Sequence, residues 1–311
     1  MNRCRRSLVA VAAVAGGLLL PNLHAQQLSR LDLLTEIDAV VEQAIADGPI
    51  AAVSIGVRQR GETVIAKGYG LADLENDVTA TEHTVYRIGS ITKQFTATAI
   101  MLLVEDGKLS LDDLLTTFLP DYPANDNMVT VRHLLNHTSG IKSYTGLGAT
   151  WRDKMTLALT HDELMALFAD KPFDFPPGEQ YRYNNSGYYL LGVIIETVTD
   201  QRYADVLRER VWDPLAMLES HYLYNAPIVR HRAEGYKVEA GELLNDDPLS
   251  MLQPFSAGAL GSHSFCGRAW LAFFSAGAPG SHFFCGRARL AYIQKVFCLR
   301  ARLARIFPAG A

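Results

Sequence analysis

The stretch YRIGSITKQF at residues 86–95 places Ser90 and Lys93 at the start of an apolar segment that runs to Val104. Residues three positions apart on a helix share a face, so the Lys93 amine can reach the Ser90 hydroxyl. A serine hydroxyl is a weak nucleophile until a neighbouring base removes its proton, and lysine can be that base only where burial or nearby cations lower its pKa. The stretch therefore predicts a helix, ended by Gly107, that carries a nucleophile and its candidate base.

The same spacing recurs at Ser139 and Lys142. This copy contains a glycine and follows a turn-like His-Thr pair, so it lacks the helical context that the chemistry needs. We interpret it as a loop and keep Ser90 as the candidate nucleophile.

A second motif, Tyr183 followed two residues later by Asn185, is the only Tyr-x-Asn in the chain. It lies between a Pro-Pro-Gly loop and a helix that we expect Ser186 to cap. A phenol can act as acid or base towards a serine hydroxyl where cationic neighbours lower its pKa, and Asn185 can donate to a substrate carbonyl and accept from Lys93. The alternative is an ordinary turn in which asparagine bonds the local backbone.

Hydrophobic periodicity predicts the remaining elements. Residues 31–47 form one expected helix, and residues 51–59 and 63–69 form an expected antiparallel hairpin. Further helices are expected at 111–118, 130–135, 162–169, 186–198 and 203–211. Strands that are followed by a long run of helices indicate an α+β fold, with helices beside an antiparallel sheet.

The composition limits the classes of protein that the chain can represent. Its 311 residues are 49% hydrophobic and 20% charged, with a net charge of −4. That apolar content excludes a disordered chain and suits one large domain or two small ones. The acidic balance argues against a nucleic-acid partner, whose phosphates require a basic surface.

The N-terminus has the pattern of an export signal. Three arginines among the first six residues precede an apolar run over residues 8–20, which is too short for a comfortable membrane span. We expect residues 1–25 to be a signal peptide, cleaved to leave a mature bacterial protein, periplasmic or secreted, with no stable membrane span. An uncleaved anchor is the alternative.

The C-terminal part has an unusual composition. Residues 248–311 contain no acidic residue, and residues 256–274 and 275–293 are near-copies that agree at 14 of 19 positions. A solenoid needs more repeats, and a membrane-surface helix needs one continuous apolar face. We therefore favour a shifted or rearranged reading frame, and treat residues 262–311 as an anomalous tail beyond a body of residues 26–261.

Four segments, in order, resemble the serine β-lactamase-related family, which includes class C β-lactamases, D-alanyl-D-alanine carboxypeptidases and esterases. They are YRIGSITKQF at 86–95, GKLSLDD at 107–113, HLLNHTSGI at 133–141, and the stretch from the Pro-Gly at 177–178 through the Tyr-x-Asn block to the Leu-Leu-Gly at 190–192. The resemblance extends from about Ile37 to Leu260.

This resemblance implies a serine β-lactamase-like α+β fold and acyl transfer. It makes Ser90 the acylated nucleophile, Lys93 and Tyr183 the proton-transfer pair, and Asn185 a partner of substrate and lysine. The implied substrate is a small molecule or peptide with an amide or ester: a β-lactam, a D-amino-acid peptide or a small ester. We expect no cofactor and no metal, and the oligomeric state stays open.

His133 and His137 are four residues apart, as in a zinc-binding helix. No glutamate lies between them, and no third ligand is evident. We interpret both as structural histidines.

Family members also carry Lys-Thr-Gly or His-x-Gly on a strand downstream of Tyr-x-Asn, and nothing after Tyr183 matches either pattern. We therefore expect an incomplete sheet that deprives the hairpin of its neighbours, poor packing from about residue 262, and one open wall beside Ser90. The alternative function is a catalytically impaired or truncated relative that at most binds.

Overall fold

The structure is a computed structural model that describes residues 30–59, 62–124, 126–263 and 273–276. Its N-terminal elements are α1 (Arg30–Ala46), β1 (Ala52–Gln59), β2 (Glu62–Asp73), β3 (Val78–Thr79), β4 (Tyr86–Arg87), a 3₁₀ turn η1 (Gly89–Ile91) and α2 (Thr92–Glu105). The central elements are α3 (Leu115–Phe118), α4 (Val131–Leu135), η2 (Tyr144–Gly146), α5 (Ala149–Arg152), α6 (His161–Met165), α7 (Asn185–Thr199), α8 (Tyr203–Leu207) and a π-helical turn η3 (Arg208–Trp212). The C-terminal elements are β5 (His221–Tyr222), β6 (Tyr236–Glu239), β7 (Glu242–Asn245), α9 (Phe255–Gly258), β8 (Leu260–Ser262) and β9 (Phe273–Ala276).

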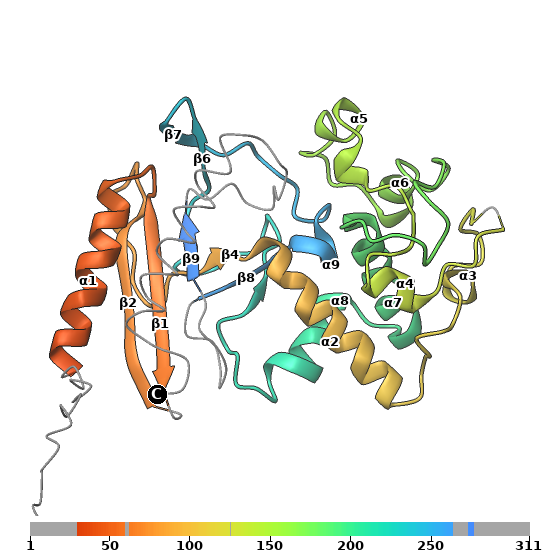
Figure 1. The fold of residues 1–311 in the computed structure, drawn as a ribbon, viewed down its shortest axis with the longest axis horizontal. Coiled ribbons are helices and arrows are strands. Elements are labelled where there is room, and N and C mark those ends of the chain that lie inside the picture. Colours follow the sequence, from red (N-terminus) through yellow and green to blue (C-terminus); the bar gives the residue numbers. More distant parts are fainter. Residues whose placement is uncertain (1–29, 60–61, 125, 264–272, 277–311) are drawn as a thin grey trace, which may run out of the picture.

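One end of the molecule is a sheet covered by α1 (Figure 1). β1 and β2 pair antiparallel from Ala52 opposite Gly70 to Gln59 opposite Glu62, which confirms the predicted hairpin. Alternate β1 residues are buried against Ile37 and Val41, four residues apart on α1. The sheet therefore has a small core of its own.

The sheet continues on the other edge of β1. Its order is β3-β2-β1-β9, and β9 pairs antiparallel with Ala52–Ile55. The expectation that the hairpin lacks this neighbour is therefore wrong for that half of β1. Ser262 and His263 are also buried, and the residues directly after them lie outside the described ranges, so the expected poor packing from about residue 262 stays a prediction. The rest of the tail and the predicted signal peptide lie outside the described residues.

The opposite end of the molecule is helical, with α7 near its centre (Figure 1). Ten consecutive α7 residues, 186–195, are buried, so this helix is apolar nearly all round. A Cβ on Gly192 would lie 2.1 Å from the Ser256 Oγ, which explains why only glycine lets α9 approach α7 this closely. The helices beside an antiparallel sheet confirm the α+β class.

A three-stranded sheet, in the order β4-β8-β5, lies between these two ends. Tyr86 pairs with Ser262 and Arg87 with Gly261, and the Ile88 N–H donates to the Leu260 carbonyl. β4 lies at the edge of this sheet, so the chain enters η1 and α2 from a strand that is held by β8.

Three expected helices are shorter in the structure, and β2 runs on to Asp73, beyond the expected strand at 63–69. α3 begins only at Leu115, because Ser110 and Asp113 close a turn in which the Ser110 N–H donates to the Asp113 carboxylate. α6 ends at Met165, and α8 ends at Leu207 and passes into the π-helical turn. In the described residues, no helix is both long enough and apolar enough to cross a membrane.

The residue that caps α7 differs from the prediction. Asn184, not Ser186, accepts a hydrogen bond from the Gly187 N–H and begins the helix. The Ser186 hydroxyl instead donates to the Lys142 carbonyl and accepts from the Tyr144 N–H. Both residue types can cap a helix, and the tertiary contact of Ser186 decides between them.

Candidate active site

Ser90 lies at the junction between β4 and the long helix α2. Gly89 directly before it has φ +51°, a left-handed conformation that glycine adopts without strain. This turn takes the chain from the strand into η1 and leaves the Ser90 side chain half-buried.

Lys93 lies almost one turn later and is only 6% exposed. Its Nζ lies 3.3 Å from the Ser90 Oγ, 2.8 Å from the Asn185 Oδ1 and 2.8 Å from the Ala257 carbonyl oxygen. Burial lowers the pKa of Lys93 to about 7. A substantial fraction of the amine is therefore neutral near neutral pH.

The neutral amine has two N–H groups and one lone pair. The carbonyl oxygens of Asn185 and Ala257 accept the two N–H groups, because neither atom can donate. The lone pair is then left for the Ser90 hydroxyl. This geometry allows Lys93 to take the Ser90 proton.

Tyr183 reaches the same hydroxyl from the loop before α7. Its OH donates to the Ser90 Oγ over 2.6 Å. Burial raises the pKa of Tyr183 above its usual value of 10.0, although the Lys93 Nζ lies 4.7 Å from the centre of its ring. The pKa of Tyr183 is therefore not lowered by cationic neighbours, and Tyr183 is a protonated donor at neutral pH.

Asn185, the first residue of α7, is fixed from three directions. Its Oδ1 accepts from Lys93, its Nδ2 donates to the Thr145 Oγ1 over 2.9 Å, and its backbone N–H donates to the Ser143 Oγ over 3.2 Å. The structure thus brings all four predicted site residues together. Sequence analysis missed Ser143 and Thr145, because single hydroxyl residues in a loop give no signal of their own.

The loop that carries Tyr183 lies along a second loop, residues 137–142. Backbone N–H groups of Asp174, Gly178 and Arg182 donate to its carbonyls over 2.7–2.9 Å. The Asp174 carboxylate accepts from both Lys142 and Arg182. Residues 139–142 form no helix, which confirms their interpretation as a loop.

Ala257 is a third residue that sequence analysis missed. α9 is held between α2 and α7, because the Ser256 Oγ donates to the Tyr188 carbonyl over 2.8 Å and the Thr96 Oγ1 donates to the Ser256 carbonyl over 2.7 Å. These bonds aim the Ala257 carbonyl at Lys93. A backbone acceptor has no side-chain signature that a sequence pattern could reveal.

The two histidines have separate structural contacts. The His133 Nδ1 accepts from the Thr130 N–H in a capping box at the start of α4. The His137 Nδ1 accepts from the Asn184 N–H over 3.1 Å. In the part of the chain that the structure describes, no group of three or more His, Cys, Asp or Glu residues is arranged to hold a metal ion.

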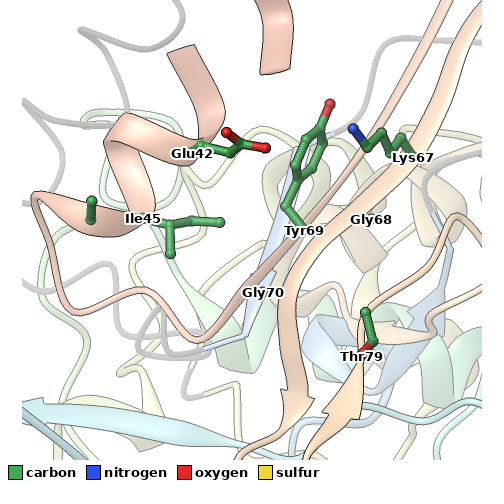
Figure 2. A pocket seen from close by; sticks show the side chains of 8 residues that line it. Glu42, Ile45, Lys67, Gly68, Tyr69, Gly70 and Thr79 are labelled. Carbon is green, nitrogen blue, oxygen red and sulfur yellow. The ribbon is translucent and has the colours of Figure 1, made fainter. Parts of the chain in front are cut away.

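A pocket of about 390 Å³ between α1 and β2 lies apart from this cluster (Figure 2). Glu42, Lys67 and Tyr69 line it, and Asp38 on α1 accepts hydrogen bonds from the last two. These bonds fasten α1 to the sheet. None of the four candidate catalytic or binding residues lines the pocket.

A family model described as Beta-lactamase matches residues 37–265. The chain belongs to the beta-lactamase family. This match includes every residue of the cluster around Ser90.

A curated relative supports the assignment of this chain to the beta-lactamase family. The protein flp of Staphylococcus aureus (strain MRSA252) is 33% identical over 214 residues, which cover 67% of this chain and 42% of flp. The chain thus spans less than half the length of this curated relative.

Solved structures share the fold. The octameric penicillin-binding protein homologue from Pyrococcus abyssi is 33% identical, with a TM-score of 0.63 over 74% of this chain and 53% of that one. The D-amino acid amidase from Ochrobactrum anthropi SV3 is 29% identical, with a TM-score of 0.66 over 75% of this chain and 67% of that one.

Proposed function

We propose that the protein is a serine hydrolase that forms an acyl-enzyme through Ser90 with an amide or ester substrate. The observation that carries the proposal is the convergence of the Lys93 Nζ and the Tyr183 OH on the Ser90 Oγ. One group has a pKa near neutrality, and the other stays protonated. An acid and a base on one nucleophile are what acyl transfer requires.

In the proposed mechanism neutral Lys93 accepts the Ser90 proton while the Oγ attacks the substrate carbonyl carbon. The tetrahedral intermediate collapses as Tyr183 protonates the leaving nitrogen or oxygen. Protonated Lys93, which lies over the Tyr183 ring, stabilises the phenolate and then returns its proton to it. Neutral Lys93 next activates a water that hydrolyses the ester on Ser90 and restores the hydroxyl.

The relatives support this substrate class. One neighbour is described as a D-amino acid amidase and another as a penicillin-binding protein homologue. A β-lactam, a D-amino-acid amide or peptide, and a small ester all present a carbonyl of this kind. The Asn185 amide, held by Thr145, can position such a carbonyl beside the nucleophile.

A catalytically impaired protein that only binds such compounds is the second candidate. It is favoured by the lack of a Lys-Thr-Gly or His-x-Gly pattern after Tyr183. Losing one oxyanion-hole donor lowers the rate about 10²- to 10³-fold in other enzymes. Measurable substrate turnover would therefore distinguish an active hydrolase from a protein that only binds.

The test is steady-state hydrolysis of nitrocefin, p-nitrophenyl butyrate and D-phenylalanine amide by the full chain. We expect turnover of at least one compound, and a loss of up to about 10⁶-fold in Ser90→Ala. Ser139→Ala is the matched control, because Ser139 has the same spacing to a lysine but lies outside the site. This variant should keep the activity of the wild-type protein. Equal activity of the Ser90→Ala and wild-type proteins would contradict the proposal. Binding without turnover would favour the second candidate.

A further inference from the structure

The imidazole of His137 packs among three tyrosines beside the active site. Its ring centre lies 4.6 Å from that of Tyr183, 5.0 Å from that of Tyr188 and 5.9 Å from that of Tyr181. The first two rings are tilted by 39° and 35° from the imidazole plane, and the third meets it edge-on at 89°. The mechanism above gives this ring no role.

Two hydrogen bonds fix the position and tautomer of His137. Its Nδ1 accepts from the Asn184 N–H, so a neutral ring carries its proton on Nε2. Its carbonyl accepts from the Arg182 N–H over 2.9 Å. His137 therefore holds the residues on both sides of Tyr183.

Lys93 contacts the same two tyrosines as His137. Its Nζ lies 4.7 Å from the centre of the Tyr183 ring and 5.5 Å from that of Tyr188. Burial, and then the nearby Lys93 charge, lower the pKa of His137 to about 4. The imidazole is therefore uncharged wherever Lys93 can act as a base.

Lys93 is enclosed by groups from four parts of the chain. They are the hydroxyl of Ser90 on η1, the Tyr183 ring on the loop, Asn185 and Tyr188 on α7, and the Ala257 carbonyl on α9. Burial is the cause of its lowered pKa, so whatever keeps water from this amine sets its basicity.

We propose that His137 is a positioning residue whose neutral ring holds Tyr183 against Ser90 and keeps water away from Lys93. Its effect on rate rests on the proposed function. Its effect on the pKa of the Lys93 amine does not depend on that function, so it can be measured even in a chain without turnover.

The test variant is His137→Asn. The Asn Oδ1 can replace Nδ1 as acceptor for the Asn184 N–H, and asparagine tolerates the φ of +60° found at this position. The change therefore removes the ring with little disturbance of the loop. His137→Gln repeats the test if His137→Asn does not fold.

The measurement is trace acetylation of the full chain with acetic anhydride from pH 5 to 11, followed at Lys93 by peptide mass spectrometry. In the wild-type protein we expect a midpoint at about 7. In His137→Asn we expect a rise of at least about one pH unit, because water reaches the amine. For any hydrolysed ester we expect kcat to fall about 10- to 100-fold, with KM within about twofold.

Two variants serve as controls. His133→Asn makes the same change four residues earlier, at the cap of α4, and should leave the Lys93 midpoint and kcat unchanged. His137→Phe keeps a ring but loses the acceptor for Asn184. It should keep the Lys93 midpoint near that of the wild-type protein while the melting temperature falls.

An unchanged Lys93 midpoint in His137→Asn, or an equal rise in His133→Asn, would overturn the inference. A rise confined to His137→Asn supports it. If that rise occurs while neither Ser90 labelling nor turnover is seen in the wild-type protein, the proposed function fails and the role of His137 in shielding Lys93 stands.

Discussion

At the residue scale, the basicity of Lys93 depends on what surrounds it. The amine is removed from water but keeps two carbonyl acceptors, from Asn185 and Ala257, so its neutral form is well bonded. The charged form loses hydration on burial, and this is the cause of the lowered pKa of Lys93. The site thereby obtains a base at neutral pH without a histidine in that role.

This lowered pKa sets the pH dependence of acylation. Lys93 acts as a base only when neutral, so the rate of Ser90 labelling by a fluorophosphonate should rise with pH and level off above a midpoint at about 7. Below the midpoint the rate should fall about tenfold per pH unit. Labelling rates from pH 5 to 9 check this. A rate that does not vary with pH would remove Lys93 from the role of base.

The four site residues could be predicted because each lies in a short motif with characteristic spacing. The pKa direction of Tyr183 could not, because burial of its side chain by residues distant in sequence raises the pKa and outweighs the lowering effect of its hydrogen bond to Ser90. The contributions of Thr145 and Ala257 also depend on tertiary contacts, about 40 and 70 residues from Asn185 in the chain.

At the element scale, the two loops beside the site act as one unit through Asp174. Burial alone would raise the pKa of Asp174, but hydrogen bonds from Lys142 and Arg182 hold it below its usual value. A carboxyl with a lowered pKa stabilises the fold above its unfolded pKa, and this stabilisation is lost as the pH falls through the folded value. The loops should therefore be most firmly joined near neutral pH.

Asp174→Asn should lower the free energy of unfolding by about 1 kcal/mol at pH 7, a modest value because both cations are partly exposed. The difference from wild type should shrink as the pH falls below about 4 and disappear only below the lowered pKa of Asp174. Denaturant melts at both pH values check this. Asp112→Asn, which breaks an exposed pair with Arg132, is the control and should change stability little. An equal loss in both variants, or a loss independent of pH, would contradict the account.

Strongly periodic elements were predicted well. α1, the β1–β2 hairpin and α2 follow the apolar pattern, because each buries one continuous face. The shorter α3 and the cap of α7 could not be predicted. The former depends on a Ser110–Asp113 turn, and the latter on a bond between Ser186 and the Lys142 carbonyl, far away in sequence.

At the scale of the whole molecule, the pairing of β9 with β1 was not foreseen. β9 spans the junction of two near-copies in sequence, and such a long-range pairing leaves no local pattern. The α+β class was foreseen, because the order of strands and helices along the chain already separates the sheet from the helical end.

We propose that the protein is exported and that its mature form begins near Gln26. The basic residues before a short apolar run motivate this proposal. N-terminal sequencing of the protein from the producing cell should give a sequence that begins near QQLSRLD. A retained Met1 in the mature protein would contradict cleavage.

The central claim, that Ser90 is the nucleophile, is tested most directly by locating the covalent adduct. The full chain is treated with a fluorophosphonate, its mass is measured intact, and the modified peptide is identified by fragmentation. We predict one adduct per chain, on the peptide that contains Ser90, and none in Ser90→Ala. An adduct on Ser139 or any other residue, or equal labelling of Ser90→Ala, would contradict the account.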